Sequence, residues 1–183
     1  MQRELVERAR LGDAEAFSSL AGPAADRLFA VAFRILRDHD RAEDATQRAL
    51  IETWEHLPSL RDPDRFEAWT YRLVVRAAIR EARRDAPWAA PLRLTDIELP
   101  AGGDPAAEVA ANDELERAFR RLSPEHRAVL VLRYFAGLPE ARIAEIIGRS
   151  VGTVGSRLHY ATRNLRGALE ADARGVLMRG RVV

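Results

Sequence analysis

The sequence contains no cysteine, and this absence excludes several kinds of protein. A disulfide-stapled scaffold, a cysteine-ligated metal site and a thiol nucleophile all need that residue. Long apolar runs are also missing, since no segment approaches the roughly 20 residues that a membrane-spanning helix needs. The charged residues 1–17 lack the apolar stretch of a secretory signal. We therefore expect a cytoplasmic protein that does not insert into a membrane.

Neither sign of charge dominates the 183 residues. The chain has 29 basic and 28 acidic side chains, which leaves a formal net charge of +1. Global charge therefore does not indicate a nucleic-acid-binding protein, and any such function must depend on local clusters of charge. Apolar residues make up 47% of the chain, which is enough to bury a core in one domain or in two small ones.

Strand patterns are absent as well, and the apolar residues repeat at helical spacing instead. We expect one helix to begin at Pro23 and to bury an apolar stripe over residues 28–36. A second helix is expected to begin at Asp40, capped together with Glu43, and to run toward Leu57. The predicted buried stripe of this second helix is Ala45, Ala49, Leu50, Trp54 and Leu57.

Residues 85–112 separate two helical halves of the chain. This segment holds four of the nine prolines, and its five acidic side chains face a single base, Arg93. It is too long for a loop within one compact domain and is predicted to be a flexible linker. The sequence thus predicts an all-α fold, with small helical domains at 1–84 and 113–174 and a frayed tail at 175–183.

The second domain has clear helix boundaries. Ser123 followed by Pro124 predicts the start of one helix, and Gly137 predicts its end. The next helix is expected to begin near Pro139 and to end at Gly148 in a left-handed C-cap.

The sequence at the end of the second domain predicts a helix-turn-helix. Ser150 caps the last helix, while Ala144 and Gly148 allow the steep crossing of two helices. The predicted buried seam of the last helix is Val154, Leu158, Ala161 and Leu165. Basic and polar side chains then face outward or flank that seam, namely Arg149, Thr153, Ser156, Arg157, His159, Tyr160 and Arg163. Such a helix can read a DNA major groove, although a plain helical hairpin with a solvated basic face shows the same pattern.

A third predicted helix, about 66–84, carries a basic stripe with aromatic residues at its start. Its candidate nucleic-acid-binding side chains are Trp69, Tyr71, Arg72, Arg76, Arg80, Arg83 and Arg84. Arginines can hold phosphates while aromatic rings stack on unpaired bases, as opened nucleic acid requires. The alternative is a solvated face over a core that contains Phe66 and Trp69, and burial is the better prediction for those two aromatics.

Together these pieces resemble the extracytoplasmic-function (ECF) sigma factors, the small two-domain members of the bacterial RNA polymerase sigma family. In the first domain the matching pieces are GDAEAF, RAEDATQRALIETW and FEAWTYRLVVRAAIREARR. In the second domain the match is LERAFRRLSPEHRAVLVLRYFAGLPEARIAEIIGRSVGTVGSRLHYATRNLRGAL. The resemblance runs from Gly12 to about Leu169, and the order of the pieces makes it specific.

The resemblance implies a transcription initiation factor that binds core RNA polymerase and promoter DNA. In this family the helix-turn-helix reads the minus-thirty-five element as duplex, and the first domain captures single-stranded bases of the minus-ten element. The outward residues of the second domain and the basic set of the third helix would make these two contacts. The helix near Asp40 would dock on polymerase through Asp40, Glu43, Asp44, Gln47, Arg48 and Ile51. An alternative for its acidic residues is ordinary complementarity to the helix dipole.

The resemblance implies no cofactor, no metal and no membrane partner. In this family a partner anti-sigma protein often holds or blocks the free domains, and the sequence leaves open whether this chain has one. Two positions depart from the family pattern, since Arg76 stands where Asn is frequent and Gly155 where Lys or Arg is frequent. The first departure leaves the captured base open, and the second removes a DNA contact that the family makes.

Three other functions are weighed against this interpretation. A regulator that binds DNA without polymerase would explain the second domain and leave the first without a role. An enzyme is not indicated, because the four histidines are scattered and neither a zinc-binding HExxH motif nor a phosphate-binding glycine loop is present. A helical scaffold would not need two separate basic helices.

Overall fold

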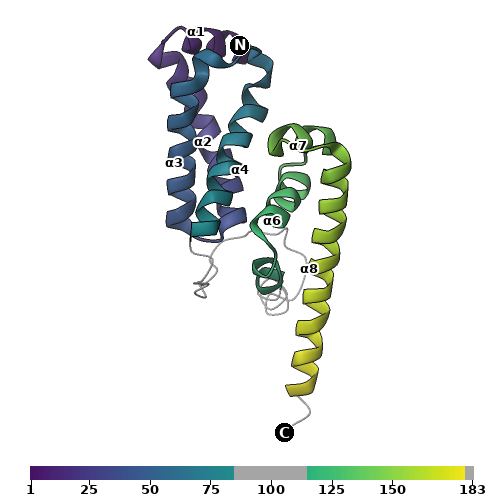
Figure 1. Ribbon diagram of the computed structural model, residues 1–183. Helices are drawn as coiled ribbons and strands as arrows, with labels where there is room; N and C mark the ends of the chain where they lie inside the picture. The colour runs from purple at the N-terminus through teal and green to yellow at the C-terminus, as the bar shows by residue number, and fades with distance from the viewer. Residues whose placement is uncertain (85–114, 180–183) are drawn as a thin grey trace.

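The computed structural model describes residues 1–84 and 115–179, with side chains as far as residue 170 (Figure 1). All regular structure in these two ranges is helical, and it forms two domains, which confirms the predicted fold class. The predicted linker, residues 85–112, lies entirely outside the described residues.

The first domain is a bundle of three long helices with a short fourth helix across one end. Its elements are α1 (Gln2–Arg10), α2 (Ala14–Leu36), α3 (His39–His56), η1 (Leu57–Ser59), η2 (Pro63–Arg65) and α4 (Phe66–Arg84). The helices α2, α3 and α4 pack pairwise against one another, while α1 packs on α2 and on the two 3₁₀ turns. The predicted stripe of α2 is buried, with Leu28, Val31 and Ile35 at its centre.

Two predicted helix starts are wrong. Helix α2 begins nine residues before Pro23, because the Asp13 carboxylate caps it by accepting from the Ala16 N–H at 2.9 Å. Pro23 therefore lies inside the helix, where it costs one backbone hydrogen bond. Helix α3 is capped by Asp38, which accepts from the Arg41 N–H at 3.1 Å, whereas the Asp40 side chain is fully exposed.

The buried face of α3 is narrower than predicted. Ala45, Ala49 and Leu57 are buried, but Leu50 is half-buried and Trp54 is 40% exposed. Small side chains line the rest of the face, which lets α3 approach its neighbours closely. Those further buried residues are Ala42, Thr46 and Thr53. The two threonines donate their hydroxyls to carbonyls one turn earlier in α3, which satisfies these polar groups inside the core.

The second domain begins with helical residues 115–120. It continues with α6 (Pro124–Leu130), the π-helical turn η3 (Val131–Phe135), α7 (Glu140–Ile147) and α8 (Val151–Arg179). Ser123 accepts from the His126 N–H, which confirms the predicted cap of α6. Helix α8 continues to Arg179, into the segment predicted to be the tail.

The two domains pack against each other (Figure 1). Helix α4 contacts α6 and α7, and α2 contacts α6 and η3. A single apolar cluster extends from α2 and α4 into α6, α7 and α8. The basic helix of the first domain therefore lies beside the helix-turn-helix of the second.

Candidate nucleic-acid interface

The α7–α8 hairpin has the local geometry of a helix-turn-helix. Gly148 is left-handed, with φ 67° and ψ 44°, and its N–H donates to the Ala144 carbonyl at 2.9 Å. The Arg149 N–H donates to the same carbonyl, which closes the end of α7. Ser150 then accepts from the Thr153 N–H at 3.2 Å and caps α8. These contacts confirm the predicted turn and the predicted start of the last helix.

The predicted seam of α8 is buried where it meets α6 and α7. Val154 and Ala161 are fully buried and Leu158 is nearly so, whereas Leu165, one turn further on, is half-buried. This orientation turns the candidate groove-reading residues outward. Arg149, Ser156, His159, Tyr160 and Arg163 are exposed, and Thr153 and Arg157 are half-buried.

The cationic groups of this outward surface are available. Among the described residues, the guanidinium groups of Arg149, Arg157 and Arg163 have no hydrogen-bond or ion-pair partner. The ring of Tyr160 is 55% exposed and lies edge-on to His159, with ring centroids 5.6 Å apart. Unpaired cations and exposed polar rings on a capped helix suit contact with phosphates and base edges.

Gly155 lies in the middle of this surface, and an acidic group stands beside it. A Cβ at this position would lie 3.3 Å from Oε2 of Glu140, at the start of α7. The small residue thus leaves room for a carboxylate at a position where the family frequently has a cation.

The arginine stripe of α4 is partly neutralised by residues from other elements. Arg80 pairs with Glu52 of α3 at 2.7 Å. Arg83 pairs with Glu125 of α6. Desolvation alone would raise the pKa of Glu125, but its own backbone N–H and the Arg83 guanidinium outweigh it and lower that pKa.

The other arginines of the stripe differ in their surroundings. Arg72 donates to the backbone carbonyl of Glu145 in α7, and Arg84 pairs with Glu81 at 3.3 Å. Arg76 is exposed and has no partner among the described residues. Arg76 is therefore the member of the stripe that is most available to a phosphate.

The aromatic residues of α4 are less accessible than the DNA-binding prediction requires. Phe66 is buried, as the alternative interpretation predicted, and Trp69 is half-buried. Tyr71 is only 8% exposed, and burial raises the pKa of its hydroxyl, with a further contribution from Glu67. In this arrangement Tyr71 belongs to the core and exposes little of its ring to a base.

The candidate polymerase-docking residues share an exposed face of α3. Asp40, Glu43, Asp44, Gln47, Arg48 and Ile51 are all exposed. Ile51 is 50% exposed and Trp54, one turn later, is 40% exposed, with its ring 4.8 Å from that of Phe17. This face combines acidic and apolar groups, and Trp54 extends it beyond the predicted set.

Sequence reasoning missed a charged cluster between the domains. Arg37 follows α2 in a left-handed conformation, and its guanidinium binds the Glu116 carboxylate through two hydrogen bonds, one of 2.7 Å. Both side chains are buried, at 5% and 7% exposure. Arg120 also donates to Glu116, at 2.8 Å. The two partners are 79 residues apart, and no spacing rule could have connected them.

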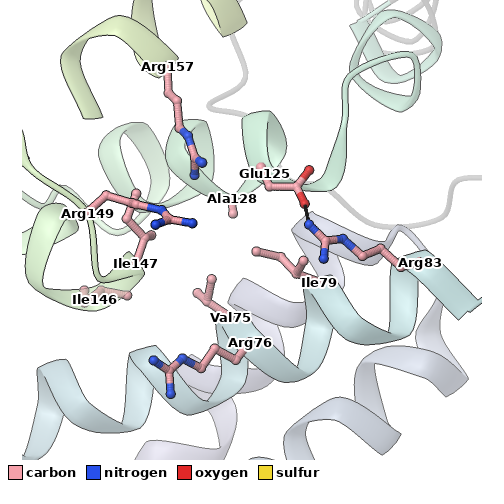
Figure 2. Close-up of a pocket in the computed structure, with 10 residues that line it drawn as sticks. All are labelled: Val75, Arg76, Ile79, Arg83, Glu125, Ala128, Ile146, Ile147, Arg149 and Arg157. Carbon is pink, nitrogen blue, oxygen red and sulfur yellow. Dashed lines mark hydrogen bonds and ion pairs between the residues drawn. The ribbon is translucent and has the colours of Figure 1, made fainter. Parts of the chain in front are cut away.

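A pocket of about 150 Å³ lies where α4 meets the second domain. Figure 2 shows Arg149 and Arg157 reaching toward it from the α8 side, with Arg83 bonded to Glu125 on the other side. Arg76 of α4 also lines the pocket, over an apolar floor. Predicted DNA-binding arginines from both domains thus surround one cavity.

Two further findings concern other kinds of site. Residues 1–84 and 115–179 contain no group of three or more potential metal ligands close enough to hold an ion. No helix in the same ranges is both long and apolar enough to cross a membrane.

Comparison with known proteins gives the same two-part division. The family model of sigma-70 region 2 matches residues 23–87, and that of sigma-70 region 4 matches residues 112–165. The ECF RNA polymerase sigma factor SigL of Mycobacterium tuberculosis is 36% identical over 169 residues, covering 90% of this chain and 95% of SigL. SigW of Bacillus subtilis is 26% identical over 178 residues, covering 91% and 95% of the two chains.

Two solved structures share the fold. CnrH, in complex with the cytosolic domain of CnrY, has a TM-score of 0.69 at 24% identity, covering 93% of this chain and 98% of CnrH. RpoE of Bartonella quintana, in complex with the anti-sigma factor NepR, has a TM-score of 0.65 at 22% identity, covering 85% and 98%. Sigma factors are transcription initiation factors that bind core RNA polymerase and promoter DNA, and they are not enzymes. With both sigma-70 regions present and a close relative matched over nearly its whole length, this chain belongs to the ECF family of RNA polymerase sigma factors.

Proposed function

We propose that α8 of this sigma factor reads the minus-thirty-five element, α4 contacts the opening minus-ten element, and α3 docks on core polymerase. The observation that carries this assignment is the capped α7–α8 hairpin, whose outward arginines have no partner among the described residues. The best overall test is run-off transcription with purified core polymerase on a library of randomised promoters, with and without the chain. Selective, chain-dependent transcripts would support the proposal and would define both promoter elements.

The same assay separates the competing functions. If the chain neither stimulates transcription nor binds core polymerase, but binds DNA selectively, it acts as a polymerase-independent regulator. A stable complex with polymerase that starts no transcript would contradict the assignment of the promoter-reading helices.

The upstream contact rests on Arg157 together with Arg149 and Arg163. Each phosphate that an arginine neutralises contributes about 0.9 to the slope of log affinity against log salt. Arg157→Ala should therefore weaken binding to the selected upstream duplex and flatten its salt dependence by about that amount. Arg27→Ala removes an equivalent charge from the exposed surface of α2 and should change neither quantity. An unchanged slope in the Arg157 variant would remove this residue from the contact set.

The downstream contact rests on Arg76 and Arg80 of α4, with Trp69, Arg72, Arg83 and Arg84 in support. Arg76→Ala combined with Arg80→Ala should slow promoter opening, because cations that hold the separated strand are lost. Reactivity of unpaired thymines in the promoter measures this opening. Core polymerase binding should stay intact, and its loss would mean that the stripe faces polymerase instead.

The docking contact rests on the exposed face of α3. Ile51→Asp would place a charge in the apolar part of that face, so binding to core polymerase should weaken while the free fold is retained. Glu4→Ala changes an exposed residue of α1, outside this face, and serves as the control. Equal affinity of the two variants for core polymerase would place the docking surface elsewhere.

The chain would work in the cytoplasm, where polymerase and promoters are located. CnrH forms a complex with the cytosolic domain of CnrY, and the sigma factor RpoE forms a complex with the anti-sigma factor NepR. We extend this to the present chain and propose an anti-sigma protein as a further partner. Dose-dependent loss of transcription on adding a purified candidate, with recovery at excess chain, would identify such a protein.

A further inference from the structure

One carboxylate of α7 lies against the helix that is proposed to read the upstream element. Glu140 is the first residue of α7, and its Oε2 lies 3.3 Å from the position that a Cβ of Gly155 would take. The Glu140 side chain is half-buried, and among the described residues it has no hydrogen-bond or ion-pair partner. The carboxylate therefore stands beside the outward surface of α8 without a protein group to bind.

The glycine at position 155 is what gives the carboxylate this access. Gly155 directly precedes Ser156 and Arg157, two of the candidate groove-reading residues of α8. Any long side chain at position 155 would start from a Cβ that is already in tight contact with the Glu140 carboxylate. Glycine is otherwise unfavourable in the interior of a helix. The helix dipole explains an acidic residue in the first turn of α7, but it does not explain a glycine in α8.

The charges around Glu140 allow a carboxylate to approach DNA. Phosphates repel a carboxylate, so an acidic group on a DNA-binding surface opposes binding unless cations offset it. The same outward surface carries Arg149, Arg157 and Arg163, whose guanidinium groups have no partner among the described residues. With the repulsion offset in this way, the carboxylate adds to affinity only where the DNA offers it a hydrogen-bond donor.

In the major groove such donors belong to two of the four bases. Cytosine presents its N4 amino group and no acceptor, whereas guanine presents two acceptors, and thymine presents an acceptor and a methyl group. Adenine presents a donor beside an acceptor, and that acceptor repels a carboxylate. A carboxylate on a groove-reading surface therefore favours cytosine over the other three bases.

We propose that Glu140 is a specificity-determining residue, whose carboxylate uses the space left by Gly155 to accept a hydrogen bond from the N4 amino group of a cytosine in the upstream element. The inference rests on the proposed role of α8. A lysine or arginine at position 155 would instead present a cation at this place, which suits guanine or a phosphate. The chain would therefore differ at one base of its upstream element from a sigma factor that carries such a cation.

The test is promoter selection from a library with a randomised upstream element, transcribed by holoenzyme that is assembled from the full chain and core polymerase. Glu140→Gln keeps the size of the side chain and replaces the carboxylate by an amide, which suits adenine better than cytosine. Glu145→Gln is the control. It removes the same charge from an exposed residue of the same helix, whose carboxylate already pairs with Arg142 at 2.9 Å.

The parent and the control should select cytosine at the same position of the upstream element. Glu140→Gln should reduce this preference about tenfold, in favour of adenine, and should leave the other positions unchanged, because one base contact is lost. A uniform gain in affinity for every sequence, with no change in base preference, would overturn the proposal. It would mean that Glu140 acts only through its charge.

Gly155→Lys tests the role of the glycine in the same assay. The lysine fills the space beside α7 and pairs with Glu140, so the cytosine preference should be lost. Adding Glu140→Gln to Gly155→Lys should then cause no further change at that position. An undiminished effect of Glu140→Gln in the lysine background would overturn the claim that the carboxylate acts through the space at Gly155.

The assay also separates this inference from the proposed function. A selected upstream element with identical base preferences in the parent and Glu140→Gln would overturn the inference and leave the proposed role of α8 standing. If the parent holoenzyme selects no upstream element, the role of α8 fails and this inference fails with it. Equal thermal unfolding of the parent and Glu140→Gln, followed by circular dichroism, shows that a changed preference does not come from a changed fold.

Discussion

Arg127 carries a charge that the fold disfavours, and replacing it by methionine should stabilise the protein. Its guanidinium is half-buried in α6, and its Nε has no hydrogen-bond partner among the described residues. Burial lowers the pKa of Arg127 to about 10, opposed by Glu116 and reinforced by the nearby Arg37 and Arg120. The group remains charged at neutral pH, so the folded state bears this cost in full.

The magnitude follows from the pKa. A fall of the pKa from its ordinary arginine value to about 10, at 1.36 kcal/mol per pKa unit, corresponds to about 3 kcal/mol against the charged form in the folded state. Partial contact with solvent reduces this to about 1–2 kcal/mol. Methionine keeps the unbranched apolar stem that packs in the protein and removes the charge. Arg127→Met should therefore raise the free energy of unfolding by about 1–2 kcal/mol and the melting temperature by about 2–6 °C.

Urea and thermal unfolding at neutral pH, followed by far-ultraviolet circular dichroism, measure both quantities. Arg166→Met removes an equivalent charge from an exposed position of α8 and should change the free energy of unfolding by less than about 0.5 kcal/mol. A loss of stability in Arg127→Met would refute the reasoning. It would mean that attraction to Glu116 outweighs burial and repulsion.

Three further predictions address single features. Gly148→Ala should lower the free energy of unfolding by about 1–2 kcal/mol in thermal unfolding, because φ is 67° while the added Cβ meets nothing within 4 Å. Gly155→Ala should raise the free energy of unfolding by about 1 kcal/mol, because alanine has the higher helix propensity. This gain requires the Glu140 side chain to shift by a few tenths of an ångström away from the new Cβ. The lowered pKa of Glu125 means that its contact with Arg83 contributes fully above about pH 4.3, the ordinary glutamate value, and is lost as pH falls through the lowered pKa. The stability that this contact contributes should accordingly persist at mildly acidic pH and be lost only in stronger acid, which urea unfolding across a pH series measures.

Helix boundaries could be predicted from the sequence wherever a single residue determines the boundary. Ser123, Gly148 and Ser150 each act on backbone groups within a few positions, so their roles could be read directly. Periodicity likewise identified the seam of α8, because Val154 and Leu158 pack against the preceding helices of the same domain. The all-α class and the candidate groove-reading surface follow from such short-range rules.

The errors arose where two local signals compete. Asp38 and Asp40 are both possible caps, and only the extended backbone of Asp38 decides between them. Pro23 resembles a helix start, yet Asp13 supplies an earlier cap, and burial of Ala16 and Leu20 sustains the intervening turns. Arg37 ends α2 in a conformation that glycine usually adopts, so no sequence signal marked that end.

Pairing across long sequence separation could not be predicted at all. The partners of Arg37, Arg72 and Arg83 lie between 42 and 79 residues away, and each pairing depends on how the two domains meet. The sequence predicts that the arginines of α4 are available to nucleic acid, because this helix itself contains few acidic residues. The second domain supplies hydrogen-bond acceptors for Arg72 and Arg83, so these two side chains are not free in the folded chain.

Because acidic groups of the second domain pair with arginines of the α4 stripe, the near balance of charge in the chain affects which partners these arginines can bind. An acidic group of the second domain and a DNA phosphate are alternative partners for the same guanidinium, since Arg83 cannot bind both with full geometry. Moderate salt should weaken the contact between Arg83 and Glu125, because this pair is partly exposed and salt screens it as it screens phosphate contacts. The buried pair of Arg37 and Glu116 is shielded from such screening, so this contact between the domains should persist at the same salt concentration.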